Sequence, residues 1–215
     1  MAETVVSPRE RYRAQVRTEI KDRAWEQIAT AGASALSLNA IAKQMGMSGP
    51  ALYRYFANRD ELITELIRDA YRSLADAFHA TAEGGTDLAG LAETVRRWAF
   101  EVPHRYFLIY GTPIPGYQAP PDTAEIAGEL MAIMLDVCAA APGDAAGEDG
   151  GAALDANLDQ VAHWGRSHPA RVQRRALTFW TRLHGVLSLE LAGHFGGMAF
   201  DPALLYEAEV DALRR

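Results

Sequence analysis

Cysteine and long apolar stretches are the two features that this sequence lacks most clearly. Cys138 is the only cysteine among 215 residues, which excludes a disulfide framework within the chain and a zinc site built from several cysteines. No run approaches the roughly 18 consecutive apolar residues of a transmembrane helix. The first 23 residues are charged and mixed and lack the apolar core of a secretory signal. We therefore expect a cytoplasmic protein with no membrane partner.

Acidic charge dominates the chain as a whole, but not its beginning. The net charge is −7, yet residues 1–60 hold nine Lys and Arg against six Asp and Glu and so carry +3. Residues 61–215 hold twelve Lys and Arg against twenty-two Asp and Glu and carry −10. Phosphate binding depends on the local field rather than on total charge. A basic N-terminal segment therefore keeps nucleic acid among the expected partners.

Helical periodicity runs through most of the chain. In the first segment Tyr12, Val16 and Ile20 recur every four residues, after an expected N-cap at Ser7 and a first-turn proline at Pro8. No stretch of strand length alternates apolar and polar residues, so the expected fold class is all-α. The expected helices cover residues 9–31, 38–45, 49–56, 59–82, 87–102, 104–110, 123–141, 154–166, 170–192 and 202–213.

Two short helices joined by a glycine-bearing turn stand out between residues 37 and 60. Ser37 and Ser48 each precede one of them and fit N-cap positions, while Gly46 permits a sharp reversal between them. Behind a long first helix, this is the geometry of a helix-turn-helix, whose second helix enters the major groove of DNA. The residues expected to pack inside it are Ile41, Met45, Leu52 and Phe56.

The run SLNAIAKQMGMSGPALYRYFANRDEL, residues 37–62, strongly resembles the DNA-binding domain of TetR-family transcriptional repressors. The resemblance is close over residues 9–60 and is carried by the Ile41-Ala42 pair, the Gly46 turn and the aromatic block that ends at Phe56. It implies a three-helix DNA-binding domain over residues 1–58 and a larger helical domain over 59–215. In that family the second domain binds an effector and forms a dimer.

The resemblance also implies roles for individual residues. Ser37, Tyr53 and Arg59 match phosphate contacts, and Tyr55 stands where a histidine is common. Arg54 has the chemistry for a bidentate guanine contact. The full set of expected DNA-binding residues is Ser37, Ser48, Gly49, Pro50, Ala51, Tyr53, Arg54, Tyr55 and Arg59.

Each assignment has a simpler alternative. Tyr53 and Tyr55 could be core aromatics, and Arg54 a solvated surface charge. Pro50 offers no amide and little reach, so base readout would lean on Arg54, thymine methyl groups and DNA shape. The arginines at positions 9, 11, 13 and 17 of the first helix fit a solvated face, although the first three could form an arm near the minor groove.

The second half carries a weaker pattern. Trp180, His184 and Gly185 form the Trp-x-x-x-His-Gly pattern of one C-terminal subgroup of the family; the first two either line an effector pocket or form a core pair. The expected ligand-binding residues are Trp98, His104, Tyr106, Phe107, Tyr110, Met134, Trp180 and His184, and the expected effector is small and largely apolar. The expected dimer interface comprises Phe179, Leu183, Leu187, Leu191, Leu204 and Leu205.

These observations predict a ligand-responsive transcriptional repressor that binds a pseudo-palindromic operator as a homodimer. Two alternatives stay open: a helical dimer that acts only in protein interactions, and an enzyme without DNA binding. The enzyme is disfavoured because no nucleophile elbow, phosphate loop or dinucleotide fingerprint is present. Asp159, His163 and His168 are conceivable metal ligands, but only the first two have helical spacing, and a loop end is a poor metal site; we expect no metal and no cofactor. Salt-sensitive DNA binding would separate the regulator from both alternatives.

Overall fold

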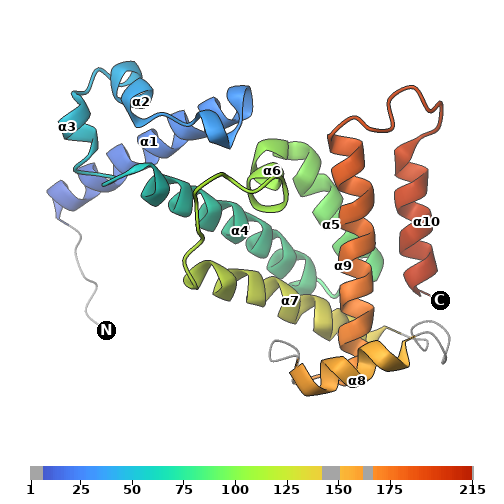
Figure 1. The fold of residues 1–215 in the computed structure, drawn as a ribbon. Coiled ribbons are helices and arrows are strands. Elements are labelled where there is room, and N and C mark those ends of the chain that lie inside the picture. The colour runs from blue at the N-terminus through green and yellow to red at the C-terminus, as the bar shows by residue number, and fades with distance from the viewer. Residues whose placement is uncertain (1–6, 142–150, 162–166, 215) are drawn as a thin grey trace. The chain divides into compact units, whose positions relative to one another are not determined.

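The computed structural model describes residues 7–141, 151–161 and 167–214, and within these ranges it contains helices and no strand, which confirms the all-α class (Figure 1). A helix is present at each expected place, and η1 is an additional 3-10 helix; the last residues of the expected helix 154–166, from 162 on, lie outside the described residues. The elements are α1 (Pro8–Ala31), η1 (Ala33–Ala35), α2 (Leu38–Gln44), α3 (Gly49–Leu52), α4 (Arg59–Glu83), α5 (Leu88–Glu101), α6 (Pro103–Tyr110), α7 (Asp122–Ala140), α8 (Ala152–Val161), α9 (Ala170–Leu191) and α10 (Pro202–Arg214).

The chain divides into two compact units. Unit 1 comprises residues 1–70 and 104–120, and unit 2 comprises residues 71–103 and 121–215. The division falls inside α4, and α6, apart from its first residue Pro103, belongs to unit 1 although it follows α5 in the chain. The predicted domain boundary between residues 58 and 59 lies earlier, at the first residue of α4, and stays a prediction about function.

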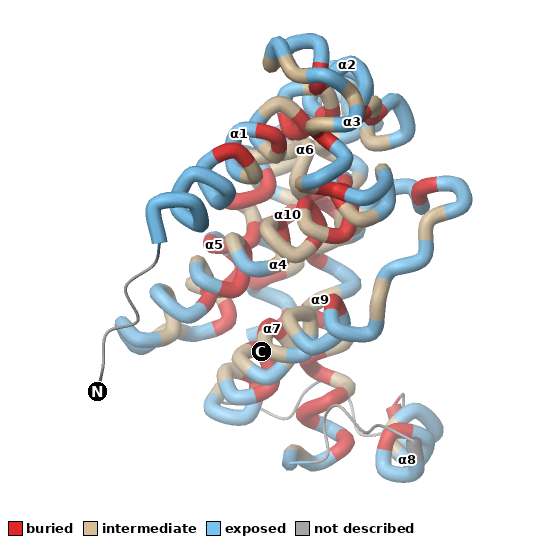
Figure 2. Tube along the Cα trace, turned by 90° about the vertical axis from the view of Figure 1, so that its left-hand side faces the viewer, coloured by how far each residue is buried: buried red, intermediate tan, exposed pale blue. Residues whose placement is uncertain are grey.

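The helices of unit 1 share one apolar core. Along α1, Ile20, Ala24 and Ile28 recur every four residues and are buried, and Figure 2 shows buried segments recurring along this helix. Leu52 of α3 and Phe56 beyond it are completely buried as well. Burial of these residues fixes which side of α3 faces outward.

A Schellman motif forms the turn between α2 and α3. The N–H of Met47 donates to the oxygen of Ala42 at 2.8 Å, and the N–H of Gly46 donates to that of Lys43 at 3.2 Å. Gly46 has φ of +64°, in the left-handed region that favours glycine. At the start of α2 the Ser37 hydroxyl accepts from the N–H of Ala40, which confirms the predicted cap.

α3 is shorter than the sequence predicts. Beyond Leu52 two main-chain bonds span three residues: Arg54 N–H donates to Ala51 at 3.4 Å and Tyr55 N–H donates to Leu52 at 2.8 Å, while the N–H groups of Tyr53 and Phe56 keep a spacing of four. Residues 53–55 are therefore a tightened turn rather than a continuation of the α-helix.

In unit 2, α9 packs against α10, α7 and α8. Phe179, Leu183 and Leu187 are at most 1% exposed within this single chain. Their expected place in a dimer interface is therefore wrong, because neighbouring helices of the same chain already cover them. Arg175 is also buried and donates to the oxygens of Ala141 at 3.1 Å and Leu213 at 3.0 Å, so one side chain caps the ends of α7 and α10.

Trp180 and His184 lie in contact on α9, with their ring centroids 3.9 Å apart. Burial lowers the pKa of His184 to about 4, because the protein interior disfavours the charged imidazolium. The imidazole is therefore neutral at pH 7.

We predict that Gly46→Ala destabilises the protein by about 1–2 kcal/mol, because a side chain penalises the left-handed conformation. An added Cβ would meet no atom within 4 Å at Gly46 or at Gly128, which lies inside α7. Gly128→Ala is thus the matched control and should be neutral or stabilising. Urea unfolding followed by circular dichroism measures both; equal stabilities of the two variants would contradict the prediction.

We predict that His184 makes the protein acid-sensitive. Its pKa is lower in the folded state than in the unfolded chain, so its destabilising effect appears as pH falls below about 6.5 and grows toward the folded-state value of about 4. Between pH 7 and 5, wild type should lose about 2 kcal/mol more unfolding free energy than His184→Gln does. His194→Gln, at an exposed position, is the control. Parallel pH profiles for His184→Gln and wild type would refute this assignment.

Candidate nucleic-acid interface

The outward side of α3 presents a small set of polar and basic groups. Ser48, Pro50 and Arg54 are exposed, and the Ser48 hydroxyl makes no capping bond to its own helix. Gly49 and Ala51 are half-buried beside them. The six residues from 48 to 54 that we expect to contact DNA therefore lie on or next to this side, since the opposite side is held by Leu52.

The two tyrosines that follow differ in exposure. Tyr53 is 46% exposed, so the alternative that it is a core aromatic is wrong. Tyr55 is half-buried. It stays a prediction that the hydroxyl of Tyr53 or of Tyr55 contacts a DNA phosphate.

Arg59 has a main-chain role that the sequence did not indicate. Its guanidinium donates to the oxygens of Ala33 at 2.8 Å, Ser34 at 3.2 Å and Leu36 at 3.2 Å. These bonds tie the first residue of α4 to the connection between α1 and α2. The predicted phosphate contact of Arg59 stays a prediction, but the side chain is directed at the protein's own backbone.

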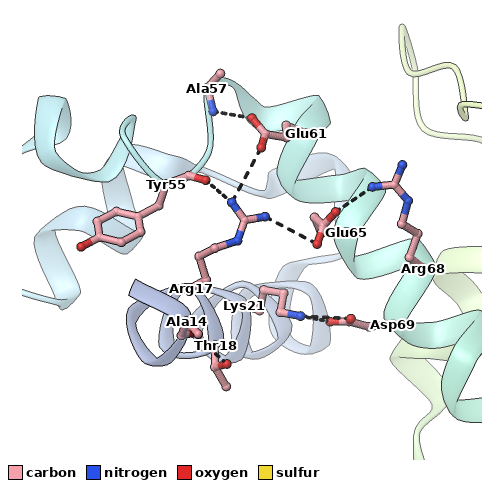
Figure 3. A network of polar contacts seen from close by, with 10 residues as sticks. All are labelled: Ala14, Arg17, Thr18, Lys21, Tyr55, Ala57, Glu61, Glu65, Arg68 and Asp69. Carbon is pink, nitrogen blue, oxygen red and sulfur yellow. Dashed lines mark hydrogen bonds and ion pairs between the residues drawn. The ribbon is translucent and has the colours of Figure 1, made fainter. Parts of the chain in front are cut away.

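Two arginines of α1 also turn toward the main chain. Arg13 donates to the oxygen of Arg54 at 3.3 Å, and Arg17 donates to the oxygen of Tyr55. Figure 3 shows Arg17 between Tyr55 and the carboxylates of α4. Periodicity in α1 places these arginines on one side of the helix, but no sequence signal points to the carbonyls that they meet. Arg9 and Arg11 are exposed, as an arm or a solvated face requires.

The predicted ligand-binding residues are divided between the two units. In unit 1, Tyr106 is completely buried and Phe107 is exposed, while Tyr110 is half-buried. His104 meets the ring of Trp25 edge-on at 5.5 Å. Burial lowers the pKa of His104, and the neighbouring Arg105 adds to this shift.

In unit 2, Met134 and Trp98 are buried, and the indole N–H of Trp98 donates to the Ser73 hydroxyl at 3.1 Å. Trp180 and His184 are half-buried. A cavity of about 490 Å³ in this unit is lined by other residues, namely Thr86, Asp87, Leu88, Val137, Ala140, Ala141, Asp211 and Arg214. Which of the eight predicted residues contact a ligand stays a prediction.

The other expected interface residues keep some exposure. Leu204 on α10 is 62% exposed, and Leu191 and Leu205 are half-buried. Their place at a dimer interface stays a prediction, unlike that of the three buried residues of α9.

Neither a metal site nor a membrane-spanning helix is present in the part of the chain that the structure describes. It holds no group of three or more His, Cys, Asp and Glu side chains arranged for a metal ion. Asp159 is exposed, and His163 lies outside the described residues. No helix in the same ranges is long and apolar enough to cross a membrane.

Both halves of the chain match models of known protein families. Residues 20–66 match "Bacterial regulatory proteins, tetR family", and residues 88–213 match "Tetracyclin repressor-like, C-terminal domain". The HTH-type transcriptional regulator Rv1816 of Mycobacterium tuberculosis is 35% identical, over 97% of this chain and 94% of its own length.

Solved structures give the same result. The structure of regulatory protein SCO4313 is 65% identical with a TM-score of 0.88, covering 96% of this chain and 98% of that one. A Rhodococcus sp. RHA1 structure at 21% identity has a TM-score of 0.68 over 93% and 94% of the two chains, which is a likeness of fold alone. With a helix-turn-helix in its first unit and matches over both halves, the chain belongs to the TetR family of transcriptional regulators, which are not enzymes.

Proposed function

We propose that this regulator is a repressor that binds a pseudo-palindromic DNA operator as a homodimer in the cytoplasm. The observation that carries the proposal is the exposed side of α3, where Ser48, Pro50 and Arg54 stand opposite a fully buried Leu52. A helix-turn-helix places such a helix in the major groove. The net charge of +3 over residues 1–60 favours approach to phosphate.

The dimer would form through an apolar stripe on α9 and α10. On α10, Leu204, Ala208 and Ala212 are exposed and recur every four residues. On α9, Leu189 is 45% exposed, and a Cβ at Gly185 would meet no atom within 4 Å, so this side accepts close packing. A two-fold dimer presents two copies of α3 to two half-sites, which matches a pseudo-palindromic operator.

Release from DNA would follow the binding of a small, largely apolar effector. The cavity of about 490 Å³ in unit 2 has the size of a small-molecule site, and the aromatic residues predicted from the sequence offer further contacts. α4 contributes residues to both units and is the element through which binding would favour a form with lower operator affinity. A differential affinity of about 100-fold supplies roughly 3 kcal/mol, enough to empty an operator.

Fluorescence anisotropy tests the DNA-binding proposal, with a duplex that the wild-type protein selects from a random pool and a scrambled duplex. Wild type should bind the selected duplex more tightly, with affinity that falls steeply as salt rises. Arg54→Ala should lose about 1–3 kcal/mol of preference at one or two base pairs. Equal weakening on every duplex would refute the base contact. Failure of wild type to select any sequence would leave the protein-interaction alternative.

We predict that Leu204→Glu gives monomers, because a carboxylate would be buried without a partner at the proposed interface. Leu154→Glu is the matched control, since Leu154 is 44% exposed on α8, away from the stripe. Sedimentation velocity separates the two species. A Leu204→Glu dimer would show that the interface lies elsewhere.

A further inference from the structure

We infer that Arg17 is a positioning residue for DNA recognition: it holds the turn that follows the recognition helix and makes no DNA contact of its own. The inference rests on the proposed function, in which α3 reads DNA. It assigns a role to a side chain of α1 that lies outside the helix-turn-helix in sequence.

One guanidinium meets three elements of unit 1. Arg17 extends from α1 and donates to the main-chain oxygen of Tyr55, in the turn after α3. Its planar group lies 4.2 Å from the ring centroid of Phe56. On α4, it pairs with Glu65 at 3.5 Å and with Glu61 at 3.9 Å, and Figure 3 shows these contacts around Arg17.

The turn after α3 depends on donors from elsewhere in the unit. α3 ends at Leu52, and the carbonyls of Gly49, Ala51 and Leu52 accept from N–H groups of residues 53–55, so the carbonyls of the turn itself need other donors. Arg13 and Arg17 supply donors to two successive carbonyls, those of Arg54 and Tyr55. The peptide groups on either side of Tyr55 are thereby held, and with them the direction in which Tyr55 leaves the backbone and the position of the neighbouring Arg54.

The same arginine ties this turn to α4. Glu61, which pairs with Arg17, also accepts the N–H of Ala57 at 2.6 Å, and the N–H of Glu61 is capped by Asn58 at 2.8 Å. The chain between the turn and α4 is therefore bonded at both ends. A shift of the first turns of α4 would move the carboxylates that hold Arg17.

Charge balance separates this role from a phosphate contact. Two carboxylates stand within 4.0 Å of the Arg17 guanidinium, whose side chain is 28% exposed. Glu65 also pairs with Arg68 at 2.7 Å, so these two carboxylates balance the charges of two arginines and leave no excess positive charge among the four groups to attract a phosphate. The fork and flat face of an arginine are both used, since separate nitrogens reach Tyr55 and Glu65 while the plane covers Phe56. A lysine has neither feature.

The test uses Arg17→Lys and Arg17→Met, with Lys21→Met as the matched control. Lys21 lies one turn further along α1 and pairs with Asp69 of α4 at 2.7 Å, so its loss removes a similar ion pair between α1 and α4 at a site away from the turn. Hydrogen exchange of residues 49–57 in the DNA-free protein is measured first. Anisotropy then follows binding to the selected and scrambled duplexes over a salt series.

We expect exchange at residues 49–57 to rise by about 10-fold in Arg17→Lys and to stay unchanged in Lys21→Met, with α1 and α4 protected in both. Affinity for the selected duplex should fall about 10-fold in Arg17→Lys, with loss of preference over the scrambled duplex. The salt slope should equal that of wild type, because no phosphate contact is lost. If Arg17→Met does not fold, the comparison of Arg17→Lys with wild type decides the test.

Three results would overturn the inference. The first is unchanged hydrogen exchange at residues 49–57 in Arg17→Lys, and the second is an unchanged preference of this variant for the selected duplex. The third is equal weakening of its binding to both duplexes with a salt slope reduced by about 0.9, because such a reduction indicates a lost phosphate contact. If wild type selects no duplex at all, the proposed function fails instead. Exchange then still reports whether Arg17 holds the turn.

Discussion

Main-chain carbonyls at helix ends require hydrogen-bond donors from elsewhere in the chain, and much of the tertiary structure of this protein depends on the arginines that supply them. Short helices leave most of their carbonyls without partners inside the helix. In unit 1, Arg59 donates to carbonyls of the connection before α2, and Arg17 donates to a carbonyl of the turn after α3. In unit 2, Arg175 serves the ends of both α7 and α10. In each case a long cationic side chain joins elements that are distant in sequence, so local structure and tertiary packing stabilise one another.

The fold could be predicted from the sequence wherever one segment determines its own structure. The cap at Ser37, the turn at Gly46 and the bounds of α2 follow from residues within a few positions of one another. The length of α3 could not be predicted in this way. Its main chain tightens after Leu52, in a turn whose carbonyls accept from Arg13 and Arg17, more than 35 positions earlier. Helical periodicity carries no information about such a contact.

The candidate sites show the same limit. Apolar residues on α9 predict that a side of the helix is buried, but not what buries it. Phe179 and Leu187 are covered by helices of their own chain, whereas Leu189 and Leu204 remain exposed. The exposed residues around α3 were easier to predict, because Leu52 and Phe56 had to point inward and left Arg54 outside. Which aromatic residues bind a ligand depends on packing that no single segment reveals.

The two sides of α3 and of the turn after it should tolerate substitution to different degrees. Ser48, Pro50 and Arg54 are exposed and can be exchanged without disturbing the core. Leu52 and Phe56 are completely buried and cannot. If the outward side reads DNA as proposed, one copy could after gene duplication acquire a new target sequence through a few substitutions there while keeping its stability. Substitutions that change binding would then lie on the exposed side of α3 and the turn after it, while the buried side that holds the fold would stay the same.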